Sequence, residues 1–384
     1  MTIAYHCPTT AGLTTGRIPY SSDGCVLSDS ANLTFNGTAL SVVGKHTQQV
    51  IDTPTTFYLA PSGSDSTGDG TSGTPWLTIA KAMSYLAPFS ISAQVTITMA
   101  DGGYSTAAVT DLSHPFGRYI TLTGTNTYTK TIDSVVNYSG SPGAYSVILQ
   151  LTTSGVANIT VNDYILLSNC AGGNTPSYLD GCHLITNVDT GNKRITITCK
   201  HKATWGIGIN CSTATAVVIP TIIVCAGDGL ALTQSNFKQI KNLVLVGPGA
   251  TNTGLTTDGV SVCNASPNLG ICNFQYAYNI ENGSRLTVNT SAFFASGCTI
   301  GCLAQSNSSI NAFYAVMSGN TYGFYALQGA SIDAEQSVAT GNTTGYQANY
   351  FSNIRTSGNT ATGNTTDYNP TLNTIAANNS LIAS

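Results

Sequence analysis

The sequence has few charged residues. Asp, Glu, Lys and Arg make up 8% of the chain, against about a quarter in ordinary soluble domains. Only Glu281 and Glu335 are glutamates, and the lysines and arginines form no basic run. This distribution argues against nucleic-acid binding. Hydrophobic residues make up 42% of the chain, so the low charge does not indicate disorder.

Export and membrane signals are also missing. Residues 1–20 lack the basic start and apolar core of a secretory signal peptide. No apolar run approaches the length of a membrane span. We therefore expect assembly in a cytoplasm and no membrane insertion.

Metal-binding patterns are absent as well. There is no Cys-x-x-Cys string and histidine is scarce, so a zinc site is not expected. The segment from Asp65 to Gly70 lacks the alternating acids of an EF-hand loop. We expect no metal and no cofactor. The cysteines are odd in number, 11, so at least one cannot pair within the chain. Buried thiols are favoured over disulfides, which stay an open alternative.

The sequence does contain a repeat of 22 residues between positions 297 and 368. Three series of residues keep this period in phase. The first is Gly297, Gly319-Asn320, Gly341-Asn342 and Gly363-Asn364. The second is Gly301, Gly323 and Gly345, and the third is Ile310, Ile332 and Ile354. The unit is too short for a helix pair, and its Gly, Asn, Thr and aromatic content favours short strands and turns. Such a unit buries its apolar face by stacking on copies of itself. The repeat therefore predicts a parallel β-helix with about 22 residues per coil.

Equivalent residues of successive coils should lie about 4.8 Å apart. The asparagines then form a side-chain ladder at one turn, preceded by glycines with unusual backbone angles. Phe324 and Tyr346 fall in a column that alternation places in the core. Tyr325 and Gln347, one position on, are predicted to point outward.

The rest of the chain shows different patterns. Leu33 and Phe35 alternate before Asn36-Gly37, and Leu40 and Val42 follow it, which predicts a hairpin. Thr74-Pro75 is predicted to start a helix whose buried face carries Ile79, Ala82, Met83 and Leu86. Residues 137–210 break the solenoid pattern, and Val161–Leu167 and Arg194–Cys199 within them are predicted to be strands.

Several strings resemble bacteriophage tailspike and tail-fibre proteins with a pectate-lyase-like fold. They are Gly12-Leu13-Thr14-Thr15-Gly16-Arg17-Ile18-Pro19-Tyr20, the segment from Leu27 to Leu40, Asn162-Asp163-Tyr164 and Asp180-Gly181-Cys182-His183. The order of strand, loop, short helix and strand over 56–104 is similar too. The resemblance implies an all-β, right-handed single-stranded parallel β-helix with a capping helix.

The resemblance also implies the division of the chain and its partners. The expected parts are 1–52 (a virion-attachment and oligomerisation module), 53–136 (first coils with the capping helix), 137–210 (an inserted antiparallel module), 211–368 (regular coils) and 369–384 (a tail). The implied state is a homotrimer in a phage tail, attached to a tail or baseplate protein through residues 1–52, with a host surface polysaccharide as ligand.

Paired carboxylates would indicate polysaccharide cleavage. Asp333 and Glu335 sit two apart and are predicted to point outward together. Arg355 follows Asp333 by 22 residues, so a cross-strand ion pair explains the same residues. Asp258 and Glu281, near one coil apart, are the other pair. A lyase would need a base, and the candidates near this pair are Lys238, Lys241 and Arg285.

We therefore expect a receptor-binding tailspike or fibre that binds a host glycan. Tyr325, Gln347 and Arg355 are the predicted ligand contacts, and Asp333 and Glu335 are the candidate catalytic residues. A polysaccharide depolymerase on the same fold and a purely structural or decorating virion protein are the alternatives.

Overall fold

The computed structural model describes residues 17–21, 27–35, 40–42, 49–152, 155–170, 179–201, 211, 214–249, 251–287, 292–376 and 380–384. Two compact units are formed, one from residues 1–51 and 88–90 and one from the remainder. No helix within the described ranges is long and apolar enough to cross a membrane.

In the first unit, β2 (Leu27–Phe35) pairs antiparallel with β1 (Arg17–Ser21) and with β3 (Leu40–Val42). Phe35 lies opposite Leu40, so the predicted antiparallel pair around Asn36-Gly37 is confirmed, while residues 36–39 lie outside the described residues. β4 (Gln49–Ile51) pairs with β6 (Phe89–Ile91).

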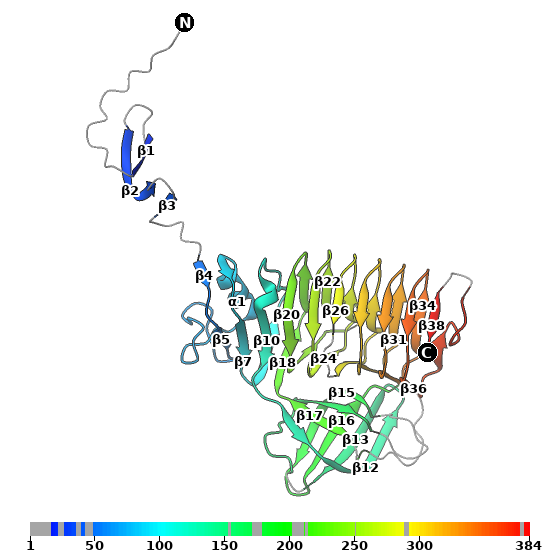
Figure 1. Cartoon of the computed structure of the whole chain (residues 1–384). Coiled ribbons are helices and arrows are strands. Elements are labelled where there is room, and N and C mark those ends of the chain that lie inside the picture. The colour runs from blue at the N-terminus through cyan, green and yellow to red at the C-terminus, as the bar shows by residue number, and fades with distance from the viewer. Residues whose placement is uncertain are drawn as a thin grey trace. The chain divides into compact units, whose positions relative to one another are not determined.

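The second unit is a parallel β-solenoid of about 11 turns with about 24 residues in each, which confirms the predicted fold (Figure 1). Each complete coil adds one strand to each of three parallel sheets, and β5 and β38 extend one of these sheets at its two ends. The 22-residue spacing holds in the last coils, where Asn311 pairs with Asp333 and Asp333 with Arg355. Earlier coils are longer: Leu243 pairs with Leu269, 26 residues on.

The three sheets are named here by their first and last strands. The β5–β38 sheet contains β5 (Thr55–Leu59), β7 (Val95–Met99), β10 (Ile120–Gly124), β20 (Asn236–Lys241), β23 (Val262–Ala265), β26 (Arg285–Thr287), β29 (Ser309–Asn311), β32 (Ser331–Asp333), β35 (Asn353–Arg355) and β38 (Leu381–Ala383). The β8–β36 sheet contains β8 (Gly102–Thr106), β18 (Thr221–Cys225), β21 (Leu243–Val246), β24 (Leu269–Cys272), β27 (Phe293–Ser296), β30 (Val316–Ser318), β33 (Val338–Thr340) and β36 (Thr360–Thr362). The β9–β37 sheet contains β9 (Thr110–Asp111), β19 (Leu230–Thr233), β22 (Thr253–Asp258), β25 (Tyr276–Ile280), β28 (Ile300–Ala304), β31 (Tyr322–Leu327), β34 (Thr344–Asn349) and β37 (Thr366–Asn369).

The predicted ladders run through the solenoid interior. The Phe324 and Tyr346 rings stack with centroids 5.0 Å apart and planes within 4°, and Tyr368 continues the stack. The Asn342 amide donates to Asn364 Oδ1 at 3.0 Å, and its own Oδ1 accepts the Asn320 backbone N–H at 2.9 Å. Stacking therefore explains both columns, as the repeat predicts.

The capping helix is α1 (Ile79–Leu86), drawn in Figure 1 at the end of the solenoid that carries the first strands. Its predicted buried face is confirmed: Ile79, Ala82, Met83 and Leu86 are buried. The predicted start at Thr74-Pro75 is wrong. Trp76 instead forms a parallel bridge with Leu59, and Asp65 binds the backbone N–H and the hydroxyl of Thr78. Thr78 is the N-cap, whose Oγ1 accepts the Lys81 N–H at 3.1 Å. A single 3-10 turn, η1 (Gly117–Tyr119), precedes β10.

An antiparallel sheet interrupts the solenoid between β10 and β18, as predicted. Its strands are β11 (Tyr128–Lys130), β12 (Ile132–Ser141), β13 (Ala144–Leu151), β14 (Tyr164–Ser168), β15 (Gly181–Asp189), β16 (Arg194–Cys199) and β17 (Thr215–Ile219). The sheet thus runs from Tyr128 to Ile219 and extends beyond 137–210 at both ends, because β11 and β17 pair with each other.

This inserted module packs on the β8–β36 sheet. Leu166 and Cys182 of the module share a core with Phe294 and Val316 of the solenoid, and the Cys182 N–H donates to Ser296 Oγ at 2.9 Å. This contact is a second reason for glycine at the repeated turn positions, in addition to the backbone conformation of the turn. Gly341 has the left-handed backbone that a turn glycine permits, with φ of 63°, and a β-carbon there would also meet the ring of His201.

The nine cysteines among the described residues are buried thiols.

The last strand extends the solenoid near the C-terminus: β38 pairs with β35, and Ile382 is fully buried. The last described residues therefore extend the solenoid by one strand.

Candidate functional site

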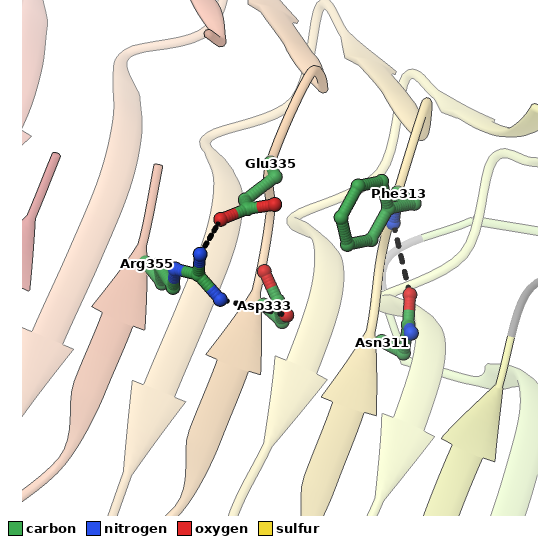
Figure 2. Close-up of polar contacts among 5 residues, drawn as sticks. All are labelled: Asn311, Phe313, Asp333, Glu335 and Arg355. Carbon is green, nitrogen blue, oxygen red and sulfur yellow. Dashed lines mark hydrogen bonds and ion pairs between the residues drawn. The ribbon is translucent and has the colours of Figure 1, made fainter. Parts of the chain in front are cut away.

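The predicted ion pair across two coils is present. Asp333 on β32 lies directly opposite Arg355 on β35, and the Arg355 guanidinium contacts both Asp333, at 3.9 Å, and Glu335 (Figure 2). β32 ends at Asp333, so Glu335 reaches the arginine from the turn that follows. Cross-strand pairing accounts for Asp333 and Arg355, and Glu335 joins them from outside the strand.

Asn311 occupies the same register position one coil earlier. Its Oδ1 accepts the Phe313 backbone N–H at 3.3 Å, as Figure 2 shows. The outer surface around Asp333 is a shallow groove of about 290 Å³ that also includes Arg285, Ser331 and Asn353. Short polar side chains line most of it.

Tyr325 and Gln347 lie elsewhere. They face each other in register on β31 and β34 of the β9–β37 sheet, whereas Asp333 and Arg355 belong to the β5–β38 sheet. The chain turns a corner between the two sheets at Gln328 and Gly329, which both have positive φ. The structure therefore does not bring the predicted ligand contacts into one patch.

Tyr325 and Gln347 form part of an outer hydrogen-bonded network. The Asn369 amide donates to Gln347 Oε1 at 2.8 Å, Gln347 donates to Asn349 Oδ1 at 3.0 Å, and Asn349 donates to the Tyr325 hydroxyl at 2.9 Å. Gln347 is on the outer side but only 6% exposed, because its neighbours cover it. The Tyr322 ring lies 5.2 Å from that of Tyr325.

We call this surface the tyrosine–amide face. It consists of Tyr322, Tyr325, Gln347, Asn349 and Asn369. Each side chain is positioned by a strand of a rigid solenoid and by its partners in the adjacent coil. Phenol hydroxyls and amides both donate and accept hydrogen bonds, and the rings add apolar area. Such a surface can bind a neutral, hydroxyl-rich chain.

The second carboxylate pair lies on the same sheet. β22 ends at Asp258 and β25 ends at Ile280. Thr257 pairs with Ile280, which places Asp258 beside Glu281 in adjacent coils. The amide of Asn282 donates to Asp258 Oδ1 at 2.6 Å, and that of Gln305 donates to Glu281 Oε2 at 3.0 Å.

Burial and the nearby Asp258 charge raise the pKa of Glu281, while hydrogen bonds from Asn279 and Gln305 partly oppose the shift. A carboxyl group with a raised pKa beside a second carboxylate is the arrangement that general acid catalysis uses. The bases considered for a lyase, Lys238, Lys241 and Arg285, belong to strands of the other, β5–β38 sheet.

Within the described part of the chain, no three His, Cys, Asp or Glu side chains are grouped to hold a metal ion. Sequence reasoning did not assign the corner residues Tyr350 and Phe351, which are 59% and 67% exposed. The signal available was their position: they occupy the turn that Gln328-Gly329 fills one period earlier.

No family model matches this chain, and no curated protein matches it. Among solved structures, a matching chain is titled "Glycoside hydrolase"; it is 8% identical over 85% of this chain and 96% of that chain, with a TM-score of 0.19. At such a TM-score the likeness carries no argument about function.

Proposed function

We propose that this protein is an attachment protein of a phage tail whose tyrosine–amide face binds a polysaccharide of the host cell surface. The observation that carries the binding role is the network from Asn369 through Gln347 and Asn349 to Tyr325. Its amides are held in place before any ligand arrives, so little side-chain freedom is lost on binding. The adjacent tyrosine rings supply apolar area for the faces of sugar rings.

The solenoid suits a polymeric ligand. Each coil repeats the same outer positions about one strand spacing, ~4.8 Å, further along the axis. A chain lying along the axis would meet outer side chains of successive coils, such as Tyr325 and Asn349, while the covered Gln347 holds its neighbours in place. Few charges lie on this face, which favours uncharged sugars.

The virion context is supported by the sequence resemblance to tailspike and tail-fibre proteins. On that basis we propose that residues 1–52 attach the protein to a tail or baseplate protein and that three chains assemble into a homotrimer. Trimerisation would add contacts between long solenoids with polar faces.

An array of purified bacterial surface polysaccharides tests the binding role. Wild-type protein should bind at least one polysaccharide, and Tyr325→Ala should weaken that binding about tenfold, which corresponds to about 1.4 kcal/mol. Tyr138→Ala is the matched control, because Tyr138 is an exposed tyrosine on β12 of the inserted module and should bind like wild type. Absence of binding to every polysaccharide would favour a purely structural virion protein.

Hydrolysis of the bound polysaccharide is the second candidate function, and the raised pKa of Glu281 beside Asp258 favours it. Glu281 would give its proton to the glycosidic oxygen of the departing sugar while Asp258 attacks the anomeric carbon. Water deprotonated by the Glu281 carboxylate would then hydrolyse the glycosyl–Asp258 bond and restore both residues. Adjacent strands are ~4.8 Å apart, a spacing from which two neighbouring side chains can reach the ~5–5.5 Å carboxyl separation of retaining glycosidases.

Release of reducing ends from the bound polysaccharide decides between binding and hydrolysis. Hydrolysis by this pair requires that Glu281→Gln stop the release while Asp333→Asn and Glu335→Gln leave it unchanged. If Asp333→Asn or Glu335→Gln stops it, the catalytic pair is the one at Arg355. No release from a tightly bound polysaccharide leaves binding alone.

A further inference from the structure

The corner between the β9–β37 and β5–β38 sheets has an unusual backbone in every regular coil. Two consecutive residues adopt positive φ at Gly259-Val260, Asn282-Gly283, Ser306-Asn307, Gln328-Gly329 and Tyr350-Phe351. Glycine and asparagine tolerate this left-handed backbone best. The earlier four corners each contain at least one of them, but Tyr350 and Phe351, with φ of 54° and 63°, are both bulky.

Packing does not explain the two aromatic residues. Tyr350 and Phe351 are 59% and 67% exposed, so most of each side chain buries nothing in the solenoid. The hydrogen bond that continues the corner ladder, from Gly329 N–H to Tyr350 O at 2.9 Å, uses backbone atoms alone. The fold at this corner would be satisfied at least as well by Gln and Gly, which the preceding coil uses.

The surroundings of the pair have the composition of a sugar subsite. Tyr350 and Phe351 line an open hollow of about 420 Å³ together with Asn307, Gln328 and Gly329. The lining is aromatic and amide, with no charged side chain among these residues. Apolar rings beside a few fixed polar groups are typical of small-molecule sites.

The hollow also follows the tyrosine–amide face directly along the chain. Tyr350 directly follows Asn349, whose amide donates to the Tyr325 hydroxyl at 2.9 Å. A chain bound over Tyr325 can therefore continue past Asn349 to the corner. We infer that Tyr350 and Phe351 form a second binding subsite that holds a neutral sugar unit of the same polysaccharide. The inference rests on the proposed function.

A double variant, Tyr350→Gln with Phe351→Gly, copies the preceding corner and tests this subsite in the full chain. The polysaccharide best bound on the array is cut by partial acid hydrolysis into fragments of graded length. The longest fragments should bind the double variant about tenfold more weakly than wild type, while the shortest bound fragments should bind both equally. The melting temperature should rise, because glycine relieves the left-handed backbone.

A lower affinity together with a higher melting temperature separates a role in ligand binding from a role in stability. Tyr350→Phe is a control that should retain binding. Unchanged affinity for every fragment length, with wild type binding normally, would overturn the subsite alone. A melting temperature below that of wild type would show that Tyr350 and Phe351 stabilise the fold. A changed sedimentation coefficient would assign it to contact between copies of the chain. No binding by wild type would refute the proposed function as well.

Discussion

Replacing Asn342 by alanine should destabilise the solenoid more than any replacement of an exposed polar residue. Asn342 is fully buried. Its Oδ1 accepts the Asn320 N–H at 2.9 Å, and its Nδ2 donates to Met317 O at 3.0 Å and to Asn364 Oδ1 at 3.0 Å. Alanine cannot replace any of these bonds.

The magnitude follows from the groups left behind. A buried polar group that loses its partner costs about 1–3 kcal/mol, and Asn342→Ala strands both the Asn320 N–H and the Met317 carbonyl. The expected loss is therefore about 2–6 kcal/mol. Asn364→Ala is the matched control. Asn364 is half-buried at the end of the ladder, so water can replace part of its bonding and the loss should be less than half as large.

Urea unfolding followed by far-UV circular dichroism measures both losses, from midpoints and slopes compared with wild type. The reasoning would be refuted if Asn342→Ala cost less than about 1 kcal/mol, or no more than Asn364→Ala. Either result would mean that the ladder side chains are wetter or less restrained than their burial indicates.

Three further predictions concern the junction, the ion pair and acid. Gly341→Ala should destabilise the chain well beyond Gly283→Ala in thermal unfolding. Both glycines have positive φ, but only at Gly341 does an added β-carbon meet the His201 ring. A double-mutant cycle of Arg355→Ala and Asp333→Asn, measured by urea unfolding, should give a coupling free energy of less than about 1 kcal/mol that disappears at high salt. The reason is that the arginine side chain is 63% exposed. A larger coupling that does not depend on salt would contradict this. Burial lowers the pKa of His183 from 6.5 to about 4, so the unfolded chain binds more protons between these values and stability should fall as pH falls through them. In urea midpoints measured at several pH values, His183→Gln should reduce that slope, and an unchanged slope would contradict the assignment.

The repeat determines much of this structure because each of the last coils stacks on a neighbour of the same length. The column of Phe324 and Tyr346, the asparagine ladder and the pairing of Asp333 with Arg355 all follow from one period of 22 residues and alternation along a strand. Residues in register in successive coils must be neighbours, whatever the rest of the chain does.

The repeat does not specify at which residues a coil turns from one sheet to the next. Tyr325 and Asp333 are eight residues apart in sequence, yet the corner at Gln328-Gly329 assigns them to different sheets. The start of α1 depends on Asp65, 13 residues before Thr78. The contact of His201 with Gly341 joins segments 140 residues apart. The last two are long-range contacts that no local pattern specifies.

Carbene footprinting of the full chain, with and without the polysaccharide best bound on the array, tests the tyrosine–amide face most directly. Binding along this face predicts reduced labelling of Tyr322 and Tyr325, with no change in labelling at the exposed Tyr138 of the inserted module. Protection confined to the inserted module or to the groove at Arg355, with Tyr322 and Tyr325 labelled as before, would contradict it.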